Sequence, residues 1–151
     1  MPPDDGDIVR ATGYVAIYCG HLESRVQEVC DCLGDNVNVS SKAPTSVKAK
    51  ACLEAIAAID ENLELEDLRG LLEDTEILLR RRNEIMHGLL SMTKQGLIRA
   101  NPRTGDQTLV TASDVYELAR EIWNVQSTYA GPLFIRLPRS IQNYIAQKLA
   151  T

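Results

Sequence analysis

Apolar residues recur along most of the chain at the three- and four-residue spacing that places them on one face of a helix. The first such stretch follows an acidic segment that offers capping side chains, and Gly34 is suited to end it because glycine readily adopts the left-handed conformation. Gly131 and Pro132 are expected to end the fourth stretch, and Pro138 to open the last one. The predicted helices, in chain order, cover residues 8–33, 45–60, 65–90, 114–130 and 138–150.

One segment departs from this helical spacing. Residues 97–100 and 108–111 are short runs typical of strands, and a turn-forming stretch containing Asn, Pro and Gly separates them. Aromatic residues make up only 5% of the chain and hydrophobic ones 44%, which suits helices packed through aliphatic side chains. The 151 residues are enough for one core. The sequence therefore predicts a single all-α domain over residues 1–151, a bundle of four to five helices with a small β-hairpin insertion near residues 97–111.

Asp114, followed by Glu117 three residues later, resembles a capping box at the start of the fourth helix.

The same spacing predicts which side of the second, fourth and fifth helices is buried. The positions expected to face the core on the second, fourth and fifth helices are Val47, Ala51, Ala55 and Ile59, then Val115, Leu118, Ile122, Val125 and Tyr129, and finally Ile141, Tyr144, Ile145 and Leu149.

The third predicted helix carries an arginine within its apolar face. The spaced positions on this face are Leu71, Thr75, Leu78, Arg82, Ile85 and Leu89. A guanidinium stays charged and is costly to bury alone, so Arg82 requires a carboxylate, a phosphate or a solvent-filled cleft opposite it. A carboxylate within the fold, such as Glu54 or Glu76, and the phosphate of a ligand are both open alternatives.

A histidine follows this arginine by five residues. His87 lies four residues after Asn83, hence one helical turn later on the same side, where the amide is placed to orient the imidazole. Arg82 and His87 are separated by about 140° around the helix axis and would flank a groove. The alternative role of His87 is structural, because a cation is favoured at the C-terminal end of a helix.

The segment from Arg82 to His87 reads R-N-x-x-x-H and resembles the R-x4–6-H motif of HEPN domains, including the polar residue that often follows the arginine. HEPN domains are small all-α modules, and many are metal-independent endoribonucleases in which two protomers bring their motif helices together. The resemblance implies a homodimer through the third helix, with Arg82, Asn83 and His87 as catalytic residues. RNA would be cleaved to a 2′,3′-cyclic phosphate and a 5′-hydroxyl.

The resemblance also suggests the biological setting of such an enzyme, namely a toxin or phage-defence effector with a protein antitoxin or inhibitor as partner. In one branch of the family the motif continues to R-x4-H-x-Y, and the tyrosine receives a nucleotide modification. Leu89 occupies that position here, so this mode of regulation is not expected. A second interpretation stays open, a catalytically inactive HEPN-like module that binds RNA, a nucleotide or a partner protein.

The charges are divided between two halves of the chain. The net charge of −5 argues against a non-specific nucleic-acid binder. Residues 1–78 hold 6 basic and 16 acidic side chains, whereas residues 79–151 hold 10 basic and 5 acidic ones, so a phosphate-bearing ligand would be drawn to the second half. Arginines at helix surfaces are often merely solvated, which is the alternative to an RNA contact. The candidate RNA-binding residues are Arg80, Arg81, Arg99 and Arg103.

Neither a metal ion nor another cofactor is expected. The four cysteines, Cys19, Cys30, Cys32 and Cys52, contain no Cys-x2-Cys pair and are too few for a disulfide framework, which favours a reducing compartment. The acidic N-terminal segment does not resemble a signal peptide, and no run of 18 apolar residues occurs. A soluble, cytoplasmic protein without a membrane segment is therefore expected.

Overall fold

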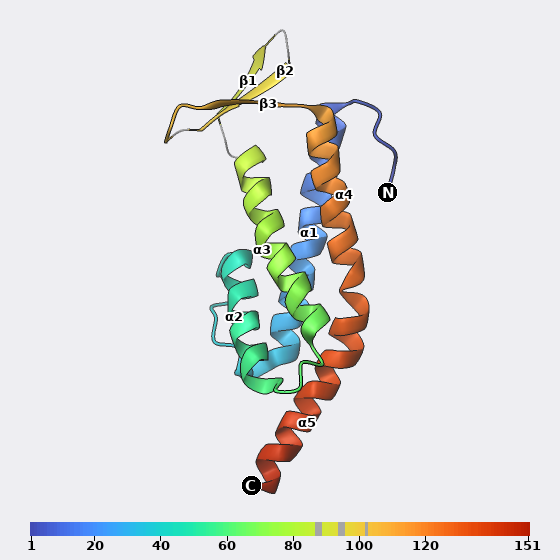
Figure 1. Ribbon diagram of the computed structural model, residues 1–151, viewed down its shortest axis with the longest axis vertical. Coiled ribbons are helices and arrows are strands. Elements are labelled where there is room, and N and C mark those ends of the chain that lie inside the picture. Colours follow the sequence, from blue (N-terminus) through green and yellow to red (C-terminus); the bar gives the residue numbers. More distant parts are fainter. Residues whose placement is uncertain (87–88, 94–95, 102) are drawn as a thin grey trace.

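The computed structural model describes residues 1–86, 89–93, 96–101 and 103–151. It is a bundle of helices with a small antiparallel sheet at one end, as predicted (Figure 1). The helices are α1 (Ile8–Leu33), α2 (Thr45–Ile59), α3 (Glu66–Met86), α4 (Ala112–Thr128) and α5 (Leu137–Ala150), with a 3-10 turn at Gly34–Asn36 and a π-helical turn at Pro132–Arg136. The strands are β1 (Leu89–Thr93), β2 (Gly96–Ala100) and β3 (Gln107–Val110).

Helix α1 packs along α4 and also contacts α2 and α3. Its predicted bounds are confirmed at both ends. The Asp7 carboxylate accepts hydrogen bonds from the backbone N–H groups of Val9 and Arg10, at 2.9 and 3.1 Å, and Gly34 follows the last residue with a φ of +55°. The buried face of α1 consists mainly of Val15, Cys19, Leu22, Val26, Val29 and Leu33.

Helix α2 begins and ends within a residue of its predicted bounds, but the predicted buried face is wrong in part. Val47 is exposed and Ala51 only half-buried. Apolar residues occupy most positions between Ala49 and Ile59, so no single spacing identifies the side that packs against α1 and α3. The buried positions of α2 are Ala49, Cys52, Ala55, Ile56 and Ile59.

Asp60 fixes the start of α3. Its carboxylate is buried and accepts hydrogen bonds from the backbone N–H groups of Leu65 at 2.7 Å and Glu64 at 3.3 Å. Arg69 donates to the Asp60 carbonyl oxygen at 2.9 Å, and its guanidinium balances the charge of this carboxylate. The loop between α2 and α3 is thereby tied to the first turns of α3.

Helix α3 is shorter than predicted and ends at Met86. Residues 89–93 form β1 instead, which pairs with β2 in the register Leu89↔Ala100 to Thr93↔Gly96. The far edge of β2 pairs with β3, so the predicted hairpin is confirmed and a third strand is added to it. The sheet offers residues 89–93 hydrogen-bond partners. Residue 88 in the sequence is a glycine, and a glycine within a helix lowers its stability by about 1 kcal/mol relative to alanine.

Helix α4 begins two residues earlier than predicted. Thr111 is its N-cap: the hydroxyl accepts from the Asp114 N–H at 3.1 Å, and the Asp114 carboxylate accepts from the Thr111 N–H at 3.0 Å. The capping box therefore pairs Thr111 with Asp114, and the predicted pair of Asp114 with Glu117 is wrong. Its predicted buried face is confirmed at Val115, Leu118, Ile122 and Tyr129, whereas Val125 is half-buried.

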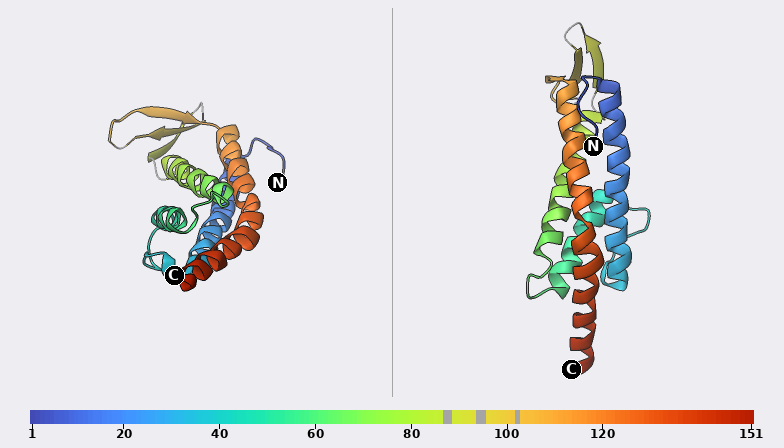
Figure 2. Two further views of the ribbon diagram at one scale, coloured as in Figure 1. Left: turned by 60° about the horizontal axis from the view of Figure 1, so that its bottom comes forward. Right: turned by 90° about the vertical axis from the view of Figure 1, so that its right-hand side faces the viewer.

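Helix α4 ends at Thr128, two residues before its predicted end, and α5 begins at Leu137, one residue before the predicted start at Pro138. The chain continues through the π-helical turn at Pro132–Arg136 into α5, and the two helices follow one curved path (Figure 2). A widened turn accommodates a proline that cannot donate a backbone hydrogen bond. Helix α5 projects beyond the bundle, so Ile145 and Leu149 are exposed and only Ile141 and Tyr144 of the predicted face are partly covered.

Candidate functional site

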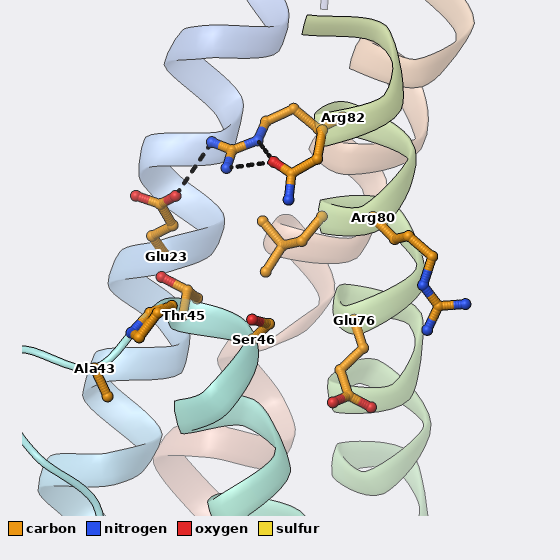
Figure 3. A pocket seen from close by; sticks show the side chains of 10 residues that line it. Glu23, Ala43, Thr45, Ser46, Glu76, Arg80 and Arg82 are labelled. Carbon is orange, nitrogen blue, oxygen red and sulfur yellow. Dashed lines mark hydrogen bonds and ion pairs between the residues drawn. The ribbon is translucent and has the colours of Figure 1, made fainter. Parts of the chain in front are cut away.

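Arg82 lies where the buried face of α3 reaches the surface. Leu71, Thr75 and Leu78, which precede it on this face, are buried, whereas the Arg82 side chain is 27% exposed. Its Nε and Nη2 atoms donate to the Asn83 Oδ1 atom at 3.2 and 3.0 Å (Figure 3). Because one amide oxygen accepts two hydrogen bonds from the same guanidinium, the plane of Arg82 is fixed by its neighbour in sequence.

The carboxylate opposite Arg82 comes from α1. Arg82 Nη1 donates to Glu23 Oε1 at 3.4 Å, across 59 residues of sequence, and neither Glu54 nor Glu76 provides this partner. The Cys19 thiol lies one turn of α1 before Glu23, close to the same guanidinium. Burial raises the pKa of Cys19 to about 11, an effect that Arg82 opposes and Glu23 reinforces, so the thiol is neutral at physiological pH.

A pocket of about 470 Å³ opens beside Arg82. Three parts of the chain form it: α1 through Glu23, the loop before α2 with the first residues of that helix, and α3 (Figure 3). Its volume lies within the range of about 300–1,000 Å³ typical of small-molecule sites. The lining residues are Glu23, Ala43, Pro44, Thr45, Ser46, Glu76, Leu79, Arg80, Arg82 and Asn83.

The four predicted RNA-binding arginines do not lie together in the structure. Arg80 lines the pocket with Arg82, whereas Arg81 faces α4 and forms an ion pair with Glu121. Arg99 donates to the Glu84 carbonyl oxygen at 2.8 Å, which satisfies one of the carbonyl groups left open at the end of α3. Arg103 lies in the turn between β2 and β3. Of the predicted site residues, the structure therefore brings together Arg80, Arg82 and Asn83.

His87 lies outside the residues that the structure describes, as does Gly88. The described part of α3 ends at Met86, the residue immediately before His87. The pairing of Arg82 with His87 in one site consequently stays a prediction.

Sequence spacing missed several residues of this pocket. Glu23, Thr45 and Ser46 come from segments far from Arg82 in the chain, so no helical periodicity relates them to it. Glu76 precedes Arg80 by one helical turn and could have been placed on the same side of α3 as that residue. The available signals were the charge requirement of Arg82 and the predicted start of the second helix at residue 45, and neither signal identifies a contact between these two parts of the chain.

Comparison of the chain with protein-family models, with curated proteins and with solved structures finds no match. None of the helices described in the structure combines the length and the apolar character needed to cross a bilayer. In the described ranges, no three or more His, Cys, Asp or Glu side chains are grouped so as to hold a metal ion.

Proposed function

We propose that this protein is a metal-independent endoribonuclease that acts as a homodimer. The observation that carries the proposal is the environment of Arg82. Its guanidinium is oriented by Asn83, is partly open to solvent and lies in the wall of a pocket. The described part of its helix ends just before His87. The R-N-x-x-x-H resemblance to HEPN domains and the helical bundle support the same function.

The proposed reaction is an attack of a ribose 2′-hydroxyl on the adjacent phosphorus. The hydroxyl proton passes to the imidazole of His87, the P–O5′ bond breaks, and the leaving O5′ takes a proton from a second imidazole. The Arg82 guanidinium stabilises the negative charge that develops on the phosphoryl oxygens. Each chain supplies one motif histidine, so a two-fold dimer provides the separate base and acid.

The surface proposed for the dimer is the outer face of α3. The apolar positions before Arg82 are buried against the chain's own helices, and Glu23 already supplies an ionic partner, so Arg82 itself does not require a second copy. The outer face of α3 is nevertheless open to solvent and includes Ile77, an exposed aliphatic residue. Light scattering at micromolar concentration is expected to give twice the chain mass, and a monomer mass with undiminished cleavage would exclude a composite site.

The decisive experiment is cleavage of a mixed RNA pool in the presence of EDTA, with identification of the new ends. Replacing His87 by Ala is expected to reduce the rate about 100- to 10,000-fold by removing proton transfer. Arg82→Ala is expected to be comparably damaging because charge stabilisation at the phosphate is removed. His21→Ala and Arg120→Ala are matched controls, since both residues are exposed and lie outside the pocket.

Two results would overturn the proposed metal-independent mechanism. A His87→Ala variant that cuts at the wild-type rate would remove the histidine from the reaction, whatever its effect on stability. Loss of wild-type cleavage on addition of EDTA would indicate a metal-dependent reaction instead.

The ion pair between Arg82 and Glu23 favours a second candidate function, a catalytically inactive module that binds RNA, a nucleotide or a protein. In that case Arg82 has a structural role, and Arg82→Ala lowers the free energy of unfolding by about 1 kcal/mol or less, because the pair is partly exposed. Wild-type protein that binds RNA in fluorescence anisotropy yet leaves it intact over prolonged incubation would establish this alternative.

A further inference from the structure

The pocket beside Arg82 contains a hydrogen-bond acceptor that the protein does not use. Glu76, a half-buried residue of α3, lines this pocket, and its carboxylate has no hydrogen-bond or ion-pair partner among the residues that the structure describes. The other carboxylate in the wall, Glu23, is occupied by Arg82. Glu76 is therefore the acceptor available to a ligand.

The same pocket contains donors that are also without partners. The residue before α2 is Pro44, which has no side-chain acceptor for the first N–H groups of the helix. Its carbonyl oxygen accepts from Val47 and Lys48, whereas the N–H groups of Thr45 and Ser46 have no acceptor in the described parts of the chain. These N–H groups and the hydroxyls of Thr45 and Ser46 lie at the start of α2, on the opposite side of the pocket from Glu76 (Figure 3).

This mixture of donors and acceptors restricts the chemistry of the ligand. A free anion would meet the carboxylate of Glu76, and a cation would meet the positive end of the α2 dipole together with Arg80. A neutral group that presents two adjacent donors on one edge and acceptors on the next avoids both conflicts. Among the RNA bases, only guanine has this pattern: N1–H and the N2 amino group can bond both oxygens of one carboxylate, and O6 and N7 accept.

The remaining walls suit a flat ring. Ala43, Pro44 and Leu79 supply apolar surface. Arg80, which also lines the pocket, extends from α3 at its edge (Figure 3). Single-stranded bases bound by proteins commonly stack on such groups while their edges are hydrogen-bonded. We propose that this pocket binds a guanine base, with Glu76 accepting from N1–H and the N2 amino group and the start of α2 donating to O6 and N7.

In the RNA context, which rests on the proposed function, the guanine belongs to a nucleotide adjoining the phosphate held by Arg82. Arg82 and Asn83 line the same pocket, so a base seated there keeps its own ribose and phosphate beside the guanidinium. The proposed enzyme would then cut RNA preferentially at one fixed position relative to a guanosine.

The binding test uses four nucleoside monophosphates that differ only in the base. Calorimetric titration of the wild-type protein is expected to show binding of 5′-GMP and at least about tenfold weaker binding of AMP, CMP and UMP, as a bidentate contact provides. Inosine monophosphate, which lacks the N2 amino group, should bind with intermediate affinity. Glu76→Gln should abolish the preference for GMP, because an amide has only one acceptor oxygen, whereas Glu73→Gln, an exposed residue one turn earlier and outside the pocket, should retain it.

Cleavage-end sequencing separates this inference from the proposed function. If RNA is cut, the wild-type ends should carry guanosine at one fixed position, and the ends that Glu76→Gln still produces should lack this bias. Selective GMP binding by a protein that leaves RNA intact would support the guanine site and reject the ribonuclease. Equal affinity for all four monophosphates, or their failure to bind, would overturn the guanine site even if the protein cuts RNA efficiently.

Discussion

A buried hydrogen bond between Thr75 and Tyr129 connects α3 to the end of α4, and its removal tests quantitatively how the helix of Arg82 is held. Both side chains are fully buried, and the two oxygens are 2.7 Å apart. The Thr75 hydroxyl also lies 2.7 Å from the Leu71 carbonyl oxygen, which can only accept. Thr75 must therefore use its single proton toward Leu71, and Tyr129 is the donor to Thr75.

The two single substitutions are expected to differ in magnitude. Burial raises the pKa of Tyr129, so the phenol is protonated at neutral pH and able to donate. Tyr129→Phe removes this donor but leaves the bond from Thr75 to Leu71, so the expected loss of stability is about 1 kcal/mol. Thr75→Val leaves the Tyr129 hydroxyl buried without its acceptor, for an expected loss of about 1–3 kcal/mol.

The double variant completes the cycle. With both partners replaced by apolar groups of similar shape, no polar atom is stranded, so its loss of stability should be smaller than the sum of the two single losses. Urea unfolding monitored by circular dichroism gives the three values, provided that the denaturant slope stays constant. Tyr144→Phe, at a half-buried position of α5, is the matched control and should change stability by less than about 0.5 kcal/mol. Strict additivity of the two single substitutions, or a Tyr129→Phe loss larger than that of Thr75→Val, would refute this donor assignment.

Two further predictions concern the sheet and the cysteines. Replacing Arg99 and Arg103 by Ala should weaken RNA binding and reduce the slope of log affinity against log salt by about 1 for each phosphate that is no longer neutralised; an unchanged slope would remove both residues from the RNA path. In native protein at pH 8, an alkylating reagent should label the half-buried Cys32 first and buried Cys52 only on unfolding, because burial raises the pKa of Cys52 and restricts access to it. Equal labelling rates for the two cysteines in the folded state would contradict the burial of Cys52.

The helices with a clear apolar period were predictable from the sequence, and the ends decided by distant contacts were not. Capping at Asp7 and Gly34 is local, and the bounds of α1 were predicted correctly. The end of α3 depends on the pairing of residues 89–93 with β2. This pairing cannot be inferred from the spacing of apolar residues within α3. The path through Pro132 likewise depends on a π-helical turn that the usual meaning of a Gly-Pro pair does not suggest.

The candidate site shows the same division. The position of Arg82 in an apolar face correctly indicated that the fold must provide a counter-charge or an opening, and the structure contains both, in Glu23 and the pocket. That the carboxylate comes from α1 follows from the way α1 and α3 pack, which places residues 59 positions apart side by side. The sequence therefore indicates that this guanidinium requires a counter-charge or an opening, but it does not identify Glu23 as the residue that supplies the counter-charge.

The contacts of Arg82 also show why an intramolecular ion pair is compatible with a role at a phosphate. A guanidinium has five N–H groups, and the hydrogen bonds of Arg82 within the described ranges include two to the Asn83 amide and one to Glu23. The Glu23 contact is the longest of the three at 3.4 Å, and it joins two partly exposed groups, a class of ion pair that contributes about 1 kcal/mol or less. A phosphate can therefore compete for the guanidinium while Asn83 maintains its orientation. Under the proposed function, Asn83 positions the charge and Glu23 keeps it neutralised until RNA replaces the carboxylate.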